Sequence, residues 1–134
     1  MKHLLLITIA AVLFVGCSGF KRSVSVASFQ MPTRGICAHR GVSNTHPENT
    51  IAAFREAIRL GVHMIELDVA LSSDGYLVLM HDHTVDRTTD GSGIVGELTL
   101  ADLKKLDAGF WKGSRFKGEK IPTLKEAIDI MPYN

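Results

Sequence analysis

A histidine and an arginine, His39 and Arg40, directly follow the short apolar run 35–38. Such a run is typical of a strand, so both side chains are expected at its C-terminal end, where Gly41 turns the chain. Imidazole transfers protons near neutral pH, and the planar guanidinium group of arginine matches phosphate oxygens. These residue types together indicate acid–base chemistry on a phosphate group.

Two carboxylates lie two residues apart in the apolar segment 63–71. Strand alternation places Glu66 and Asp68 on one face and Ile65 and Leu67 on the other. Two inward carboxylates roughly 6–7 Å apart repel each other and are costly to desolvate, which favours a cation between them over a water-facing pair. Oxygen ligands favour Mg²⁺ or Ca²⁺ over zinc. We therefore predict Glu66 and Asp68 as ligands of a divalent cation that needs at least one further protein oxygen or several waters.

A second histidine, His81, ends the next apolar segment, 76–81. The connection from Asp68 is too short for a helical crossover, so the chain either returns in an extended form or makes a hairpin. A hairpin turning on residues 74–75 places Asp68 opposite His81. Both geometries bring His81 toward the carboxylates, and we predict His39 and His81 as the general acid and base.

The loop between the first strand and the next helix carries another carboxylate, Glu48. A helix is predicted over residues 50–60, with Asn49 as its N-cap. Arg40 either binds the substrate phosphate or forms an ion pair with Glu48 or Asp68. Glu48 in turn is either a metal ligand or the group that orients Arg40, and the sequence leaves both roles open.

The rest of the chain supplies few regular elements. Segment 82–120 is polar and contains one short helix beginning after Thr99, which is typical of an insertion that walls a site. A capping box formed by Thr123 and Glu126 predicts a final helix, which Pro132 ends.

The N-terminus has the pattern of a secretory signal over residues 1–16, with an apolar run that is too short for a transmembrane helix. The end of that run resembles the bacterial lipoprotein cleavage box, which predicts lipidation of Cys17. Residues 17–33 would then tether a domain over residues 34–134. We predict an extracytoplasmic, membrane-anchored lipoprotein of the bacterial envelope. Simple secretion, to the periplasm or beyond, and an uncleaved apolar anchor are the alternatives.

Charge and cysteine content exclude two further possibilities. The 15 Lys and Arg residues include Lys2, so loss of the signal leaves as many basic as acidic residues, of which there are 14. A neutral chain gives no support for a nucleic-acid partner. If Cys17 carries lipid, only Cys37 remains and no intrachain disulfide can form. Cys37 is predicted to be a small buried apolar residue.

Six short motifs, in their order and at their intervals, resemble the glycerophosphodiester phosphodiesterase family from about residue 35 to the C-terminus. They are Ala38-His39-Arg40-Gly41, Pro47-Glu48-Asn49-Thr50, Glu66-Leu67-Asp68-Val69, His81-Asp82, Asp86-Arg87-Thr88-Thr89 and Ile121-Pro122-Thr123-Leu124.

The resemblance implies an α/β fold, a (β/α) barrel of the TIM type with its site at the C-terminal mouth. It implies a divalent ion held by Glu66 and Asp68 plus a further glutamate on a later strand. It also implies His39 and His81 as acid and base, with Arg40 near the phosphate. The implied substrate is a glycerophosphodiester, cleaved to glycerol 3-phosphate and an alcohol.

The main difference from that family is the length of the chain. A complete barrel takes roughly 250 residues, and this chain has 134. We therefore expect about the first half of a barrel, with an incomplete metal shell and without activity on its own. The alternatives are a related phospholipase acting on lipid head groups, and a non-catalytic extracytoplasmic module or remnant.

Overall fold

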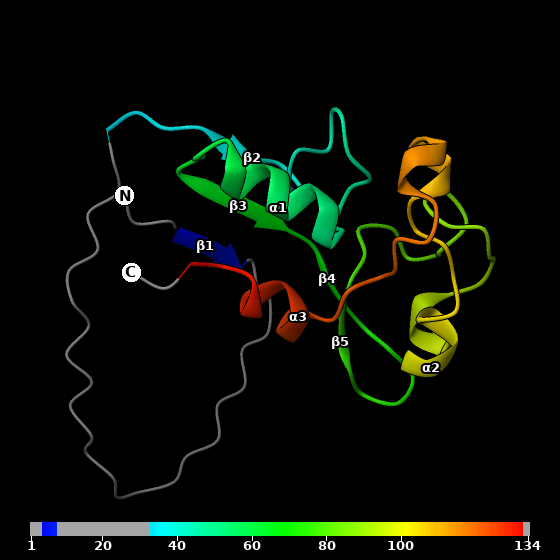
Figure 1. Cartoon of the computed structure of the whole chain (residues 1–134). Coiled ribbons are helices and arrows are strands. Elements are labelled where there is room, and N and C mark those ends of the chain that lie inside the picture. Colours follow the sequence, from blue (N-terminus) through cyan, green and yellow to red (C-terminus); the bar gives the residue numbers. More distant parts are fainter. Residues whose placement is uncertain (1–3, 8–32, 133–134) are drawn as a thin grey trace, which may run out of the picture.

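The computed structural model describes residues 4–7 and 33–132, which form two small sheets and several short helices (Figure 1). One sheet is parallel with strand order β1-β3-β2, and the other is an antiparallel pair of β4 and β5. The strands are β1 Leu4–Ile7, β2 Cys37–Ala38, β3 Met64–Leu67, β4 Val69–Leu71 and β5 Leu77–Leu79. Within the described ranges these sheets stay open and do not close into a barrel.

A βαβ unit forms the centre of the fold, as the sequence predicted. Helix α1 (Ile51–Arg59) connects β2 to the parallel strand β3 and lies across them (Figure 1). Its apolar face supplies Phe54 and Ala57 to the main core. The other core residues come from both sheets, the loop before β3 and the last helix: Ala38, Val62, Ile65, Leu67, Leu79 and Ala127.

Two local predictions around this unit were wrong. Thr50, and not Asn49, is the N-cap of α1, since its hydroxyl accepts the backbone N–H of Ala53. Cys37 is exposed and not buried. Alternation along β2 turns Ala38 into the core that α1 covers, so Cys37 lies on the other face of the sheet.

The β4–β5 hairpin has a register one residue away from the predicted one. Val69 pairs with Leu79, so Asp68 faces Met80 rather than His81. The backbone N–H of Met80 donates to the carbonyl of Asp68 at 3.2 Å. The turn itself sets this register. The hydroxyl of Ser72 accepts the N–H of Tyr76, so the turn is centred on Asp74 and not between Asp74 and Gly75.

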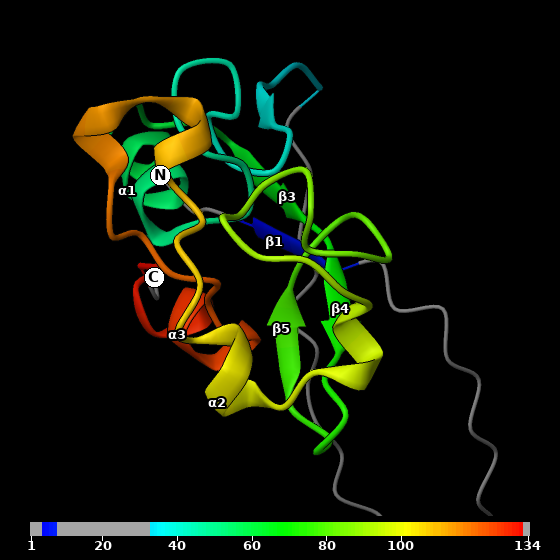
Figure 2. The same ribbon diagram turned by 90° about the vertical axis from the view of Figure 1, so that its right-hand side faces the viewer.

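Segment 82–120 and the C-terminal helix pack beside the hairpin (Figure 2). The segment contains η1 Val95–Glu97, α2 Leu100–Leu103, η2 Phe110–Lys112 and η3 Ser114–Phe116. Thr99 caps α2, and the predicted capping box of Thr123 and Glu126 opens α3 (Leu124–Asp129). Both caps confirm the sequence prediction.

Most of the N-terminal predictions concern residues that lie outside the described ranges. Of the predicted signal, residues 4–7 are described and pair in parallel with β3, whereas Cys17 and the tether lie outside the described residues. Within the described ranges, none of the helices has the length and apolar character needed to span a bilayer.

Candidate active site

The predicted site residues gather at the C-terminal ends of β2 and β3. His39 and Arg40 directly follow β2, and Asp68 directly follows β3. Because the two strands are parallel and Ala38 pairs with Ile65, the chain after β2 runs past the carboxylate face of β3. The backbone N–H of Arg40 accordingly donates to Oε2 of Glu66 at 2.9 Å.

Arg40 links all three neighbouring carboxylates. Besides its backbone bond to Glu66, its Nη1 donates to Oε1 of Glu48 at 3.0 Å. Its Nε lies 3.1 Å from Oδ2 of Asp68, but the angle does not make a hydrogen bond and Nε stays buried without one. The contact between Arg40 and Asp68 is therefore an ion pair. Both pairings that the sequence offered for Arg40 are present.

The backbone of Arg40 is in the left-handed region, at φ 55°. A residue other than glycine reaches that conformation at a cost of about 1 kcal/mol or more, and such costs concentrate at functional sites. The bond from its N–H to Glu66 and the ion pairs of its side chain hold this conformation in place.

Asn49 is a site residue that the sequence reasoning assigned only to helix capping. Its side-chain amide donates to Oδ2 of Asp68 at 2.9 Å, and its Oδ1 accepts the backbone N–H of Asp68 at 3.2 Å. Asn49 is buried and also left-handed, at φ 55°. It therefore fixes both the backbone and the carboxylate of Asp68. Its place within the motif 47–50 was the only signal available.

Arg87 is the second residue that was missed. Its guanidinium group makes two bonds to Glu48, at 2.9 and 2.7 Å, and two to Asp82, at 2.7 and 3.0 Å. These bonds raise the pKa of Arg87. They are also the largest cause of the lowered pKa of Glu48 and of Asp82. Arg87 thus keeps both carboxylates ionised.

His81 is the last residue in this series of contacts, because it bonds to Asp82. Its Nδ1 lies 2.7 Å from Oδ1 of Asp82, which favours a proton on Nδ1 and leaves Nε2 to exchange protons. The side chain is 43% exposed and so reaches solvent. His39 is also exposed, and among the described residues it makes no hydrogen bond or ion pair. Among the described residues, the two imidazoles do not bond to each other, and His81 is the one of the two that bonds to the carboxylate network.

Carboxylate oxygens of this kind are hard donors, which match the ligand preference of Mg²⁺ and Ca²⁺. Four carboxylates face two guanidinium groups, which leaves an excess of two negative charges before any histidine is protonated: Glu48, Glu66, Asp68 and Asp82 against Arg40 and Arg87. Oε1 of Glu66 and Oδ1 of Asp68 make no hydrogen bond to another described residue. The described part of the chain contains no cluster of three or more potential metal-ligating residues.

Gly41 fixes the close approach of the site loop to α1. It has φ 75°, and a Cβ there would lie 2.7 Å from Cβ and 2.8 Å from the carbonyl carbon of Ala53. We expect Gly41→Ala to lower the free energy of unfolding by at least about 2 kcal/mol, since it combines a left-handed alanine with overlap. Gly75→Ala is the matched control, with φ 86° and open space around it, and should cost about 1 kcal/mol. If urea denaturation gave equal losses of unfolding free energy for the two variants, the close approach of Gly41 to Ala53 would be contradicted.

The contribution of Arg87 to this network can be tested by measuring protein stability as a function of pH. We expect Arg87→Gln to lower stability at neutral pH by about 1 kcal/mol, a modest value because the pairs are partly exposed and screened. Lowered carboxyl pKa values stabilise the fold above the unfolded values, about 4, and this stabilisation is lost as pH falls through the folded ones. The difference from wild type should therefore shrink in acid. Arg59→Gln, which removes one partly exposed pair with Glu56, is the reference and should give a smaller difference of the same sign, because Arg59 also lowers the pKa of Glu56. A difference independent of pH would contradict this assignment.

Comparison with known proteins matches this region to one family. Residues 39–134 match the model of the glycerophosphoryl diester phosphodiesterase family. A glycerophosphodiester phosphodiesterase of Caldanaerobacter subterraneus is 56% identical over 96 residues, 72% of this chain and 40% of the relative. Human glycerophosphodiester phosphodiesterase 1 is 52% identical over 93 residues, 68% of this chain and 28% of the relative.

Solved structures show the same likeness. A phosphodiesterase of Oleispira antarctica in complex with the product sn-glycerol-3-phosphate has a TM-score of 0.69 and 50% identity, covering 69% of this chain and 38% of that one. A glycerophosphodiester phosphodiesterase of Agrobacterium tumefaciens has a TM-score of 0.68 and 45% identity, covering 69% and 40%. The chain thus spans between 28% and 40% of the length of these relatives.

Proposed function

Because this chain belongs to the glycerophosphoryl diester phosphodiesterase family, we propose that the protein hydrolyses glycerophosphodiesters to glycerol 3-phosphate and an alcohol. The observation that carries the proposal is the contact network around Arg40, which joins the backbone after β2 to Glu48, Glu66 and Asp68. The product bound to the Oleispira antarctica relative supports the substrate class. Since the chain spans only part of its relatives, activity is proposed for the protein that carries this region.

His39 and His81 are the proposed acid and base. The bond from Nδ1 of His81 to Asp82 holds the ring in one orientation and leaves Nε2 to take or give a proton. His39 directly precedes Arg40 in the chain, and its exposed ring is proposed to act on the other side of a bound phosphodiester. One ring takes a proton from the attacking hydroxyl or water, and the other gives a proton to the departing alcohol oxygen.

Arg40 is the proposed phosphate-binding residue. Its Nη1 and Nε face Glu48 and Asp68, while Nη2 makes no hydrogen bond to a described residue. Nη2 is therefore the atom proposed to donate to a phosphate oxygen. Glu48 uses both its oxygens on Arg40 and Arg87, which favours the orienting role over the metal-ligating role.

We propose Mg²⁺ or Ca²⁺ as the cofactor, held by Glu66 and Asp68 with a further ligand. The hard oxygen donors and the excess negative charge support this choice. A divalent cation bound there would supply the positive charge that stabilises the transition state of phosphodiester cleavage. Asn49 would hold Asp68 in position for it.

Attachment to the bacterial envelope through lipidated Cys17 is proposed from the sequence pattern alone. Replacing this residue, Cys17→Ser, should move the protein from the membrane fraction to the soluble extracytoplasmic fraction. Unchanged fractionation would favour an uncleaved apolar anchor.

The direct test is release of glycerol 3-phosphate from glycerophosphocholine by the purified protein with Mg²⁺ or Ca²⁺, followed by a coupled enzymatic assay. Vesicles containing lysophosphatidylcholine provide the comparison. Cleavage of the soluble diester alone supports the proposal, and cleavage of the vesicle lipid alone supports the related phospholipase. A folded protein that carries this region over the whole length of its relatives and cleaves neither would be a non-catalytic module.

A further inference from the structure

Residues 110–117, here called the aromatic–basic lip, combine exposed aromatic rings with cations. Phe110 is 56% exposed and Trp111 is 38% exposed. Each of the three aromatic rings in the lip carries a cation within reach: Lys112 over Trp111 at 5.4 Å, Arg115 over Phe116 at 4.5 Å, and Lys117 over Phe110 at 5.9 Å. The sequence from 108 to 118 contains no acidic residue, so the lip itself is purely basic.

The lip is held firmly in this exposed position. At its base, Oδ1 of Asp107 accepts the N–H groups of Gly109 and Phe110, each at 2.8 Å, and Oδ2 accepts that of Gly118 at 2.7 Å. The indole N–H of Trp111 donates to the carbonyl of Ala108 at 3.0 Å. With its polar atom satisfied internally, the indole presents hydrocarbon to the solvent.

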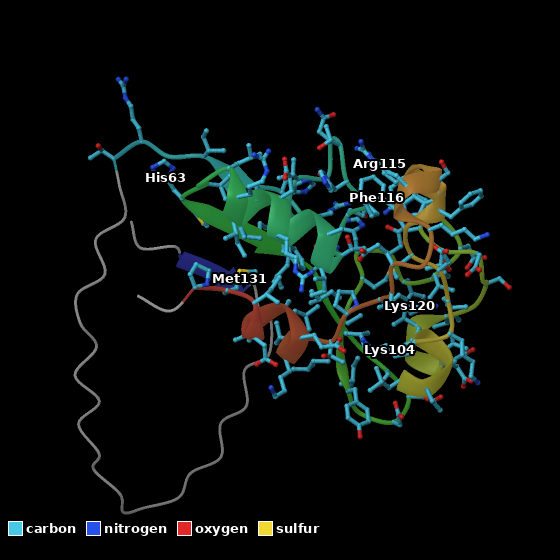
Figure 3. The ribbon with its side chains drawn as sticks, viewed as in Figure 1. His63, Lys104, Arg115, Phe116, Lys120 and Met131 are labelled. Atoms are coloured by element: carbon cyan, nitrogen blue, oxygen red, sulfur yellow. The ribbon has the colours of Figure 1, made fainter. Side chains whose placement is uncertain are left out.

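The lip is also fastened to the loop that follows His39 and Arg40. Nζ of Lys112 donates to the carbonyl of Ser43 at 2.7 Å, and Nη2 of Arg115 donates to that of Thr45 at 3.0 Å. The rings of His46 and Phe116 lie 4.9 Å apart. Figure 3 shows Arg115 and Phe116 at the edge of the lip that meets this loop. The lip therefore packs against the loop that joins Arg40 to Glu48.

We infer that the aromatic–basic lip docks on the surface of a bilayer that contains anionic phospholipids. Phe and Trp rings enter the boundary between head groups and acyl chains, while Lys and Arg are attracted to negative head groups and can lay their stems on the apolar layer. Charge complementarity thus selects an anionic lipid surface. The inference does not depend on phosphodiester hydrolysis or on the N-terminal anchor.

A second group of exposed apolar residues lacks the cations that accompany the aromatic rings of the lip. Leu71, Tyr76 and Leu77 are exposed at the turn of the β4–β5 hairpin, where the neighbouring charged residue in the turn is the acidic Asp74. None of the cation–π pairs recorded for the described residues lies there. This turn therefore provides a matched control surface.

Trp111 is the one tryptophan of the chain, so its fluorescence reports on the lip alone. With the full chain, we expect phosphatidylglycerol-containing vesicles to shift its emission to shorter wavelength and to protect it from acrylamide quenching. Phosphatidylcholine vesicles should do so at least roughly fivefold less efficiently. The double variant Phe110→Ser/Lys117→Gln should reduce partitioning by roughly tenfold. The control Tyr76→Ser/Lys105→Gln, which also removes one exposed aromatic ring and one exposed lysine, should behave like wild type.

Three results would overturn the inference. They are an emission spectrum that vesicles do not change, equal shifts with neutral and anionic vesicles, and equal losses in the two double variants. A shift caused by soluble polyaspartate but not by vesicles would assign the lip to an acidic protein partner and overturn it as well. Circular dichroism checks that both variants are folded.

Discussion

Replacing His39 with alanine is expected to lower kcat for glycerophosphocholine by roughly two to four orders of magnitude, the usual contribution of a general acid or base. His39 is exposed and makes no hydrogen bond or ion pair among the described residues, so its loss should leave the fold intact. KM should change little, because the phosphate contact is assigned to Arg40. Steady-state kinetics and thermal denaturation measure the two effects separately.

The control for this experiment is His63→Ala. His63 is also exposed but lies at the opposite end of the βαβ unit, away from Arg115 and the lip (Figure 3). Its ring accepts the backbone N–H of Ile36, so a small loss of stability with normal kcat is expected. Normal turnover by His39→Ala would remove the proposed mechanism.

The partner variant His81→Ala sharpens the same prediction. If both rings serve one proton transfer sequence, the double variant should lose little more than either single variant, since groups that act together are not additive. Each single variant should also remove one limb of the bell-shaped dependence of kcat on pH. If the fold losses of kcat in the two single variants multiply in the double variant, the two histidines act in separate steps.

Removing divalent cations with excess chelator is expected to abolish hydrolysis, and Mg²⁺ or Ca²⁺ should restore it. The physical reason is the uncompensated charge of the site, where four carboxylates face two guanidinium groups. Activity that persists in chelator would contradict the metal proposal while leaving the roles of His39 and His81 open.

Metal binding can be measured without activity. A cation that binds only the folded chain stabilises it by about 2.7 kcal/mol at a hundred times its dissociation constant. We expect this gain in thermal denaturation for wild type and its loss in Asp68→Asn, which keeps the shape that Asn49 contacts. Asp129→Asn, which removes an exposed carboxylate paired with Lys125, is the control and should keep the gain. Equal gains in both variants would place the ion elsewhere.

Local rules were enough to predict much of this protein. Helix α1, the caps Thr99 and Thr123, and the βα order of the first elements follow from apolar periodicity and from side chains that bond to nearby backbone. The spacing of Glu66 and Asp68 likewise determined that both carboxylates face away from the buried residues of β3. In each case the residues that decide the structure are neighbours in the chain.

Tertiary structure decided the rest, because the deciding partners are distant in sequence. Asn49 leaves the cap position to Thr50 because its amide bonds to Asp68, 19 residues away. Arg87 joins the site through Glu48, 39 residues earlier, and no local pattern signals that bond. The exposure of Cys37 depends on which sheet face α1 covers, and the position of His81 depends on a register set by the turn. Types and spacing of residues therefore determined the chemistry, whereas long-range contacts decided which side chains hold it in place.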